Sequence, residues 1–528
     1  MKPKVLAAVV AGLLVIGGGA FALRQFMAPA DDAAIDFVPE DAIGYMNVFI
    51  RPSNDQKRAL DGLLRKFPGI ESTDDAIEKI TEALDEAMAQ DGMDYEEDLE
   101  PWLGSQVAAF LARGGTPALP SFAFLVESKD DEAAQDFVDE VAELEEVTLE
   151  DKTYEGETYQ MDRHTDAPFA VAILDGFLVA GTEDAVKQTI DTRAGEETLE
   201  DDEDFTEAVD PLADDWIGLF YLDTGAFFDD IVAAGIPPEE RAAYEAFGID
   251  DQRPQAAILY ASPEAVTFEG TGGFDPAAQF SQLTELAGAP GLVPELPEET
   301  WGAFGIPKMG RFFDGLFEAF AGLPGFDRSQ IDAMFYAQTG LRLEEDVLSW
   351  MEDAGVFIQG TNIQTVGGGL VIESGDPGKT AGLVEKLKDL LVQQGIRPEP
   401  ESRAGLEGFS VQIPGVPSPI YALGGERLVI AYGDDAADAA AGEGPRLRES
   451  EAFRAAQDAV GDDFNISFYV DLDAAQAFGE AVSAFSGAPM DTYEEEVKPY
   501  LDVLSHMVLA AKTDGDALVQ KFVIGVEE

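Results

Sequence analysis

The chain contains no cysteine and only two histidines, His164 and His506, among its 528 residues. Without cysteine it cannot form disulfides, thiolate zinc sites or a lipidated lipoprotein terminus, and it lacks a cysteine nucleophile. Two histidines cannot build a three-histidine zinc centre, and we expect both to be ordinary surface or core residues. The composition therefore predicts no metal site and no cofactor.

Positive charge is also scarce, since 33 lysines and arginines face 104 acidic residues and the formal net charge is -71. Nucleic acid would be repelled, and few cations are present to displace its counterions, so nucleic-acid binding is excluded. Flat adsorption to anionic lipid headgroups is disfavoured for the same reason. The simplest interpretation of the acidity is solubility in a salty setting, and not a specific function.

The chain can nevertheless form a sizeable hydrophobic core, because 46% of the residues are hydrophobic and 10% are aromatic. One long uncharged run, Val5 to Leu23, lies between Lys4 and Arg24. At 1.5 Å per residue it spans about 28 Å, close to the thickness of the hydrocarbon core of a bilayer. Lys2 and Lys4 favour a cytoplasmic N-terminus. We predict that residues 1–30 are a cytoplasmic tip and a single transmembrane anchor that contacts the lipid bilayer through Val5 to Leu23.

The alternative is a cleaved signal peptide, for which Ala28-Pro29-Ala30 offers small residues at a cleavage site. The apolar run is longer than a usual signal core, and Arg24 separates it from that site. Either interpretation places the body outside the cytoplasm, as a single-pass membrane protein or as a secreted one.

The body appears twice in the sequence at an offset of about 250 residues, which is the signature of an internal repeat. Matches occur in the same order along both halves: Val38–Asp41 with Leu296–Glu299, Glu96–Asp98 and Trp102 with Glu344–Asp346 and Trp350, and Phe220–Asp223 with Phe468–Asp471. The Gly/Pro-rich stretch Ala287–Gly291 is suited to a linker. We therefore predict a first repeat over 31–286 and a second over 292–528.

Local patterns indicate the fold class of each repeat. Phe169–Leu174 and Phe177–Gly181 flank Asp175-Gly176, the sequence of a two-residue hairpin turn. Asp130–Leu144 has helical spacing, and its counterpart begins with Asp376-Pro377, a cap followed by proline. Hairpins dominate, with helices between groups of strands. The predicted fold is α+β, two tandem copies of a mainly antiparallel sheet with helices on one face, preceded by one transmembrane helix.

The start of the body resembles a known family. Ile35–Tyr45, Arg51-Pro52-Ser53, Gln56 and Leu63–Pro68 are similar to the bacterial domain of unknown function 3352 family. The resemblance implies an N-terminal membrane segment and a long extracytoplasmic body. It carries over no catalytic or binding residue, because that family is uncharacterised.

No chemical motif stands out, and we predict that the protein is not an enzyme. Carboxylates are too numerous to nominate a catalytic pair. The densest cluster, Glu200–Asp204, lacks the spacing of a calcium loop and is expected to begin a helix. The glycine-rich strings lack the P-loop lysine and the dinucleotide-binding spacing, and neither a G-x-S-x-G nor an H-E-x-x-H motif occurs.

One aromatic stripe at helical spacing is the candidate contact surface. It consists of Phe312, Phe313, Leu316, Phe317 and Phe320. Such a helix could lie on a membrane or line a lipid-sized groove, or it could simply face the core.

Three functions are compatible with these observations. The first is a non-enzymatic, membrane-anchored binding or envelope-assembly module with a protein partner. The second is a carrier of a lipid or another apolar ligand, which requires an apolar cavity of several hundred Å³ in order of magnitude. The third is a hydrolase that uses carboxylates alone, which requires two facing acids with a raised pKa.

Overall fold

The structure is a computed structural model that describes residues 32–527 apart from 71–80, 83–84, 86–87, 90–91, 117–118, 145, 163–168, 234, 238–239, 242–243, 246–247, 276–280, 321–326, 443, 487–489 and 491. The predicted anchor Val5–Leu23 lies outside the described residues, as does His164. Within the described part, no helix combines the length and the apolar character needed to cross a bilayer.

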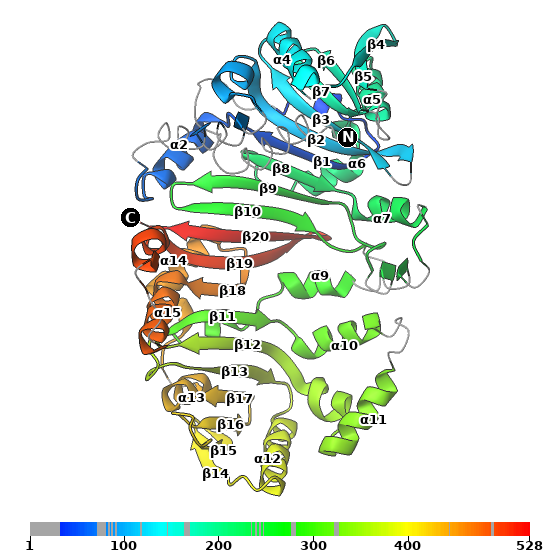
Figure 1. Ribbon diagram of the computed structural model, residues 1–528. Coiled ribbons are helices and arrows are strands. Elements are labelled where there is room, and N and C mark those ends of the chain that lie inside the picture. Colours follow the sequence, from blue (N-terminus) through cyan, green and yellow to red (C-terminus); the bar gives the residue numbers. More distant parts are fainter. Residues whose placement is uncertain are drawn as a thin grey trace. The chain divides into compact units, whose positions relative to one another are not determined.

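The chain forms two compact units, coloured blue to green and green to red along the sequence in Figure 1. The first holds the described residues up to Pro237 and Ile249–Gly272. The second holds those of Pro238–Gly248 and those from Gly273 onward. The repeat bounds 31–286 and 292–528 stay a prediction, because these units describe compactness and not ancestry.

The strands of the first unit are β1 (Ala42–Phe49), β2 (Leu103–Thr116), β3 (Leu119–Ser128), β4 (Leu149–Tyr154), β5 (Glu157–Asp162), β6 (Phe169–Leu174), β7 (Phe177–Thr182), β8 (Gly218–Leu222), β9 (Gln255–Ser262) and β10 (Ala265–Gly272). Its described helices are η1 (Ile35–Phe37), α2 (Asn54–Leu64), η2 (Tyr95–Leu99), α4 (Asp131–Leu144), α5 (Glu183–Arg193), η3 (Leu199–Asp201), α6 (Glu203–Val209) and α7 (Thr224–Ala233).

The strands of the second unit are β11 (Thr300–Ile306), β12 (Met351–Gln359), β13 (Gly367–Ser374), β14 (Glu399–Arg403), β15 (Leu406–Val411), β16 (Ile420–Gly424), β17 (Arg427–Tyr432), β18 (Asn465–Asp471), β19 (Leu504–Asp514) and β20 (Ala517–Val526). Its described helices are α9 (Ser281–Gly288), η4 (Val293–Glu295), α10 (Met309–Phe320), α11 (Arg328–Thr339), η5 (Leu343–Val347), η6 (Leu348–Trp350), α12 (Pro377–Gln393), α13 (Asp434–Ala441), η7 (Leu447–Glu449), α14 (Glu451–Val460), α15 (Leu472–Ser486), η8 (Tyr493–Val497) and α16 (Lys498–Leu501).

Each unit is built on an antiparallel sheet, and the strand order is the same in both. The first runs β10-β9-β8-β1-β2-β3-β7-β6-β5-β4. The second runs β20-β19-β18-β11-β12-β13-β17-β16-β15-β14. The predicted α+β class with mainly antiparallel pairing is confirmed.

The repeated sequence motifs occupy matching places in the two sheets. Leu199 N donates to Val38 O over 3.0 Å, and Leu447 N donates to Leu296 O over 2.8 Å. The indole of Trp102 donates to Asp98 O over 2.8 Å, just as that of Trp350 donates to Asp346 O over 2.9 Å. Both indoles are fully buried. The same residue types therefore make the same long-range backbone bond and the same local indole bond in each unit.

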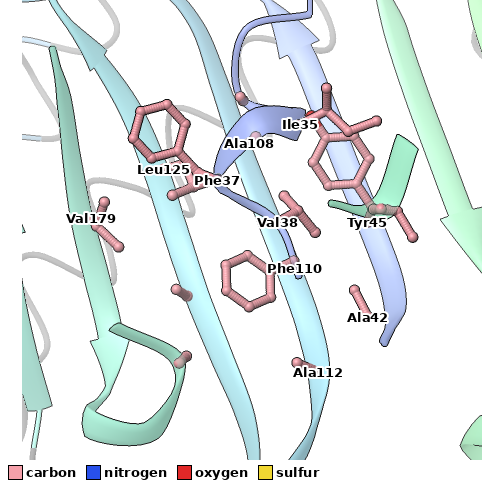
Figure 2. Close-up of a cluster of buried hydrophobic side chains, with 14 of the residues drawn as sticks. Ile35, Phe37, Val38, Ala42, Tyr45, Ala108, Phe110, Ala112, Leu125 and Val179 are labelled. Carbon is pink, nitrogen blue, oxygen red and sulfur yellow. The ribbon is translucent and has the colours of Figure 1, made fainter. Parts of the chain in front are cut away.

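The family-like opening segment builds the core of the first unit. Figure 2 shows Ile35, Phe37 and Val38, which precede β1, together with Tyr45 and Phe110 of the sheet. All five are buried. The resemblance therefore rests on residues that pack the core, which explains why it identifies no chemistry.

The prediction of helices on one face of the sheet is wrong. Successive side chains of a strand point to opposite faces, and on β7 Val179 joins a core with Val186 of α5 while Leu178 joins another with Phe137 of α4. In the second unit, α12 supplies Leu383 to one face.

The opposite face of that second sheet is covered as well. A Cβ placed on Gly367 would lie 3.0 Å from Cβ of Ala436 in α13. Strands β7 and β13 are thus covered on both sides, as the unbroken apolar run at Phe177–Gly181 could have indicated for β7.

Candidate functional site

A pocket of about 440 Å³ opens on the second unit between α15, the turn formed by η8 and α16, and the start of β19. Its walls are formed by Leu472, Ala475, Gln476, Gly479, Glu480, Ser483, Met490, Tyr493, Leu501 and Leu504. Most of these side chains are apolar, and the volume lies in the range of pockets that hold small ligands. The pocket is therefore the candidate functional site.

Helix α15 forms one wall because small and apolar residues recur along one of its faces. The hydrogen bond from Ala474 N to Asp471 Oδ1, 3.0 Å long, begins the helix after β18. Lining positions then follow at intervals of three or four residues, which share a helix face. At Gly479 no described heavy atom lies within 4 Å of the place a Cβ would take, so the glycine leaves open space in the wall.

The packing of α15 is light. Figure 1 shows it beside β18 and β19, which it contacts, but none of its residues is buried. Phe485 is 79% exposed and Val482 is 40% exposed. Few buried contacts mean a low free energy of local opening, so a ligand that adds apolar contacts here would stabilise the helix.

The rim of the pocket carries a compact ionic cluster. Lys498 Nζ lies 2.9 Å from Glu480 Oε1 and 2.8 Å from Asp502 Oδ1, and Gln476 Nε2 donates to the same oxygen of Asp502 over 2.6 Å. The hydrogen bonds to Asp502 and Glu480 raise the pKa of Lys498. The bond from Lys498 lowers the pKa values of both carboxyls.

Further acids crowd the same end of the sheet. Burial, followed by the charges of Asp471 and Asp502, raises the pKa of Asp473. His506 on β19 is buried, which lowers its pKa, and its Nδ1 lies 3.0 Å from Oγ of Ser505. The acid that faces His506 across the sheet is Asp471 of β18, whose Oδ1 accepts from Ala474 N at the start of α15.

Other acidic features of the described chain also give structural explanations. Asp202 of the Glu200–Asp204 cluster caps α6 by accepting from Phe205 N over 2.7 Å, as expected for a helix start. Within the described part of the chain, no three histidine, aspartate or glutamate side chains gather in a way that could hold a metal ion. Glu40 shares a hydrogen bond with Glu197 that raises its pKa, yet Glu40 is exposed and forms no wall of the pocket.

The predicted aromatic stripe lies on α10 and does not reach the pocket. Phe312, Phe313, Leu316, Phe317 and Phe320 are all half-buried. Their rings are partly in contact with one another, with centroids 5.8 Å apart for Phe312 and Phe313 and 6.5 Å for Phe313 and Phe317. The guanidinium of Arg328 sits 5.6 Å from the ring of Phe317. A role for this stripe in membrane or ligand contact stays a prediction.

The pocket residues were not predicted from the sequence because they form no recognisable binding motif. Ala475 and Gly479 are small, and Glu494–Glu496 make η8 look like one more acidic surface. The usable signal was a helix-length segment with small residues on one face, followed by Tyr493.

A second apolar feature crosses the sheet of this unit. Phe304 is directly paired with Val356 on one side and with Phe468 on the other, and Phe468 is paired with Leu509, which is paired with Phe522. Phe304 and Val356 are 48% and 46% exposed. We call these five residues the apolar row.

Solved structures give only a weak likeness. Crystal form III of TP0453 is 12% identical, covers 50% of this chain and 89% of its own, and has a TM-score of 0.25. Crystal form I of TP0453 is 10% identical over 47% of this chain and 81% of its own, also with a TM-score of 0.25. No curated protein matches the chain. The sequence model of the family described as "Protein of unknown function (DUF3352)" matches residues 5–517, so the chain belongs to the DUF3352 family.

Proposed function

We propose that this protein is a non-enzymatic, membrane-anchored module that binds a lipid or another apolar ligand outside the cytoplasm. The observation that carries the proposal is the pocket of about 440 Å³ with its mainly apolar walls on α15, η8, α16 and β19. Transfer of an alkyl chain from water into such walls contributes about 0.8 kcal/mol per buried methylene. Part of that gain offsets the entropy lost on association.

A carboxylate-dependent hydrolase is supported less well by the same site. A general acid needs a raised pKa, whereas the bond from Lys498 lowers the pKa values of Glu480 and Asp502. Both carboxylates are held by one ammonium group, so neither is available to donate a proton. Glu480 and Asp502 therefore act as a charged rim and not as a catalytic pair.

The proposal includes the topology and the duplication. The uncharged run Val5–Leu23 would anchor the chain, with Lys2 and Lys4 on the cytoplasmic side. Two tandem copies are supported by the identical strand order of the two sheets and by the matched bonds at Val38 and Leu296.

Topology is tested by chemical labelling, for which the absence of cysteine is an advantage. The variant Ser486→Cys places a single thiol at the exposed end of α15. A membrane-impermeant maleimide should label it in intact cells as fully as in lysed cells. Labelling that appears only after lysis would place the body inside the cell and end this part of the proposal.

Ligand binding is tested by filling the pocket. Gly479→Trp puts an indole where no described atom lies within 4 Å of the Cβ position, and replacement of a helical glycine also recovers up to about 1 kcal/mol of backbone entropy. The variant should fold normally and lose co-purifying lipid, as measured by mass spectrometry of gently extracted full-length protein.

The matched control is Gly382→Trp on α12, because Gly382 is also exposed, helical and without a described neighbour within 4 Å of its Cβ position. Wild type and the control should carry the same lipid at the same ratio. Equal lipid content in all three proteins, or lipid in none, would overturn the proposal.

A protein partner is the second candidate, and the apolar row favours it. Exposed aromatic and aliphatic side chains gathered on a sheet face mark interaction surfaces more often than scattered ones do. Phe304→Lys would place a charge in the middle of the row. Cross-linked native membranes should then yield a partner with wild type and not with this variant, and an unchanged set of cross-links would remove the candidate.

A further inference from the structure

The polar end of the pocket carries an excess of negative charge. Glu480 lines the pocket and pairs with Lys498, which is also in contact with the carboxylate of Asp502. Asp473 adds a third acid whose environment includes the charges of Asp471 and Asp502. Counting Lys498 against Glu480, Asp502 and Asp473 leaves two more negative charges than positive ones at the rim.

These charges are accessible to a ligand. The side chains of Glu480 and Lys498 are 37% and 34% exposed, and that of Asp502 is 50% exposed. Glu480 also lines the pocket, so its carboxylate meets both solvent and the apolar wall. A ligand whose chain fills the wall would therefore bring its head group against the carboxylates.

An anionic head group is disfavoured there. It would meet Glu480 and Asp502 at close range, and it could reach Lys498 only by displacing one of them. Displacement would leave a carboxylate without its ammonium partner in a half-buried place, which costs free energy. The excess of acids in the surrounding chain, with a formal net charge of -71, adds to the repulsion.

A cationic nitrogen fits the same surroundings. It would be attracted by the excess carboxylate charge without breaking the existing pairs. Tyr493 lines the pocket and its hydroxyl donates a hydrogen bond to Glu480, so an aromatic side chain lies next to the acid. Aromatic rings beside carboxylates are a recurring way to hold ammonium groups, including quaternary ones.

Resting on the proposed function, we propose that the pocket takes a single-chain amphiphile with a cationic nitrogen head, the head beside Glu480, Asp502 and Tyr493 and the chain against Leu472, Leu501 and Leu504. The shared chemistry is an alkyl chain that ends in an amine or a quaternary ammonium. It can come from a free alkylamine or from a choline-type lipid head.

The test compares head groups on one chain length. The full-length protein in nanodiscs is loaded with a fluorescent alkyl probe, and dodecyltrimethylammonium, dodecylglycerol and dodecanoate compete for it below their micellar concentrations, with empty nanodiscs as the blank. Dodecyltrimethylammonium should compete about tenfold better than dodecanoate at low salt, as expected for about one unit charge near a surface. Screening should shrink this ratio at high salt.

Two variants test whether the preference for a cationic head group depends on the acids of the rim. Glu480→Gln combined with Asp502→Asn should bring the ratio close to one. Glu385→Gln is the matched control, since Glu385 is also a helical glutamate paired with a lysine, Lys388, but lies away from the pocket. The control should keep the wild-type ratio.

Failure of this inference can be distinguished from failure of the proposed function. Equal competition by all three amphiphiles, or better competition by dodecanoate, overturns the head-group inference and leaves a pocket that binds apolar chains. No competition by any of them, together with an unaltered probe signal in Gly479→Trp, overturns both. Lysophosphatidylcholine that competes as well as dodecyltrimethylammonium supports a lipid head as the source, and weaker competition supports a free amine.

Discussion

Replacement of Asp32 by asparagine is expected to stabilise the first unit above pH 6 and to remove part of its pH dependence. Asp32 is the first described residue of the chain, and its carboxylate lies against the sheet. Oδ1 accepts hydrogen bonds from Tyr45 Oη and Asn47 Nδ2, both 2.7 Å away, and from Ile35 N at 3.2 Å. Tyr45 and Asn47 are almost fully buried.

Burial of Asp32 raises its pKa from 3.8 to about 6, although the hydrogen bonds from Tyr45, Ile35 and Asn47 oppose the rise. Between pH 4 and pH 6 the folded state therefore keeps a proton that the unfolded chain has released. The contribution of Asp32 to stability is complete below pH 4 and falls as the pH rises to about 6.

The size of the change in the free energy of unfolding follows from the shift in the pKa of Asp32. Two pKa units correspond to at most about 3 kcal/mol, and about 2 kcal/mol is a better expectation because Asp32 keeps some contact with water. Asparagine preserves the acceptor oxygen and carries no charge. At pH 8 the Asp32→Asn variant should thus be about 2 kcal/mol more stable than wild type, and at pH 4 it should equal wild type.

Differential scanning calorimetry of the full-length protein would measure this as a rise of about 4 to 8 °C in the unfolding temperature of the first unit at pH 8. Asp36→Asn is the matched control, because Asp36 is exposed and only 3.8 Å from Arg193, a surface pair worth about 0 to 1 kcal/mol. A variant Asp32→Asn that is less stable than wild type at pH 8 would refute the argument that burial dominates here.

Two further predictions concern the ionised side chain of Glu183 and the net charge of the whole chain. Hydrogen bonds from Tyr159, Lys187 and Lys152 outweigh burial and lower the pKa of Glu183 to about 2, so Glu183 stabilises the fold above pH 4.5 and loses this effect as the pH falls towards 2. Glu183→Gln should cost about 1 kcal/mol at pH 7 in denaturant titrations, and a deficit that persists undiminished at pH 2 would contradict the assignment. Raising sodium chloride from about 0.1 M to about 1 M should raise the unfolding temperature, since screening relieves the repulsion of a chain with a net charge of -71; a falling temperature would show that specific ion pairs outweigh this repulsion.

The features that sequence reasoning predicted correctly are local. The hairpin at Asp175-Gly176 has both turn residues at positive φ, 46° and 85°, and joins β6 to β7. Asp376 caps α12 by accepting from Gly378 N and Lys379 N, with Pro377 in the first turn. Each depends on a few adjacent residues whose conformational preferences are strong enough to act without distant partners.

Pairing between segments that are distant in sequence could not be predicted in the same way. The strand pairs β1–β8 and β3–β7 join segments far apart in sequence, and no local pattern specifies such partners. The second helical layer was missed although the unbroken apolar run at Phe177–Gly181 is typical of a strand buried on both faces, because so short a run does not specify which segment covers the strand.

The amino-acid sequence by itself determined the absence of thiol chemistry, the charge, the repeated motifs, the turns and the helix starts, because each follows from composition or from neighbours along the chain. Only the tertiary structure decided which strands pair, that helices pack on both faces of the sheet at β7 and β13, and that Gly479, Tyr493 and Leu504 surround one pocket. Such a pocket depends on contacts between α15, η8 and β19, whose residues are brought together by the burial of other side chains elsewhere in the unit.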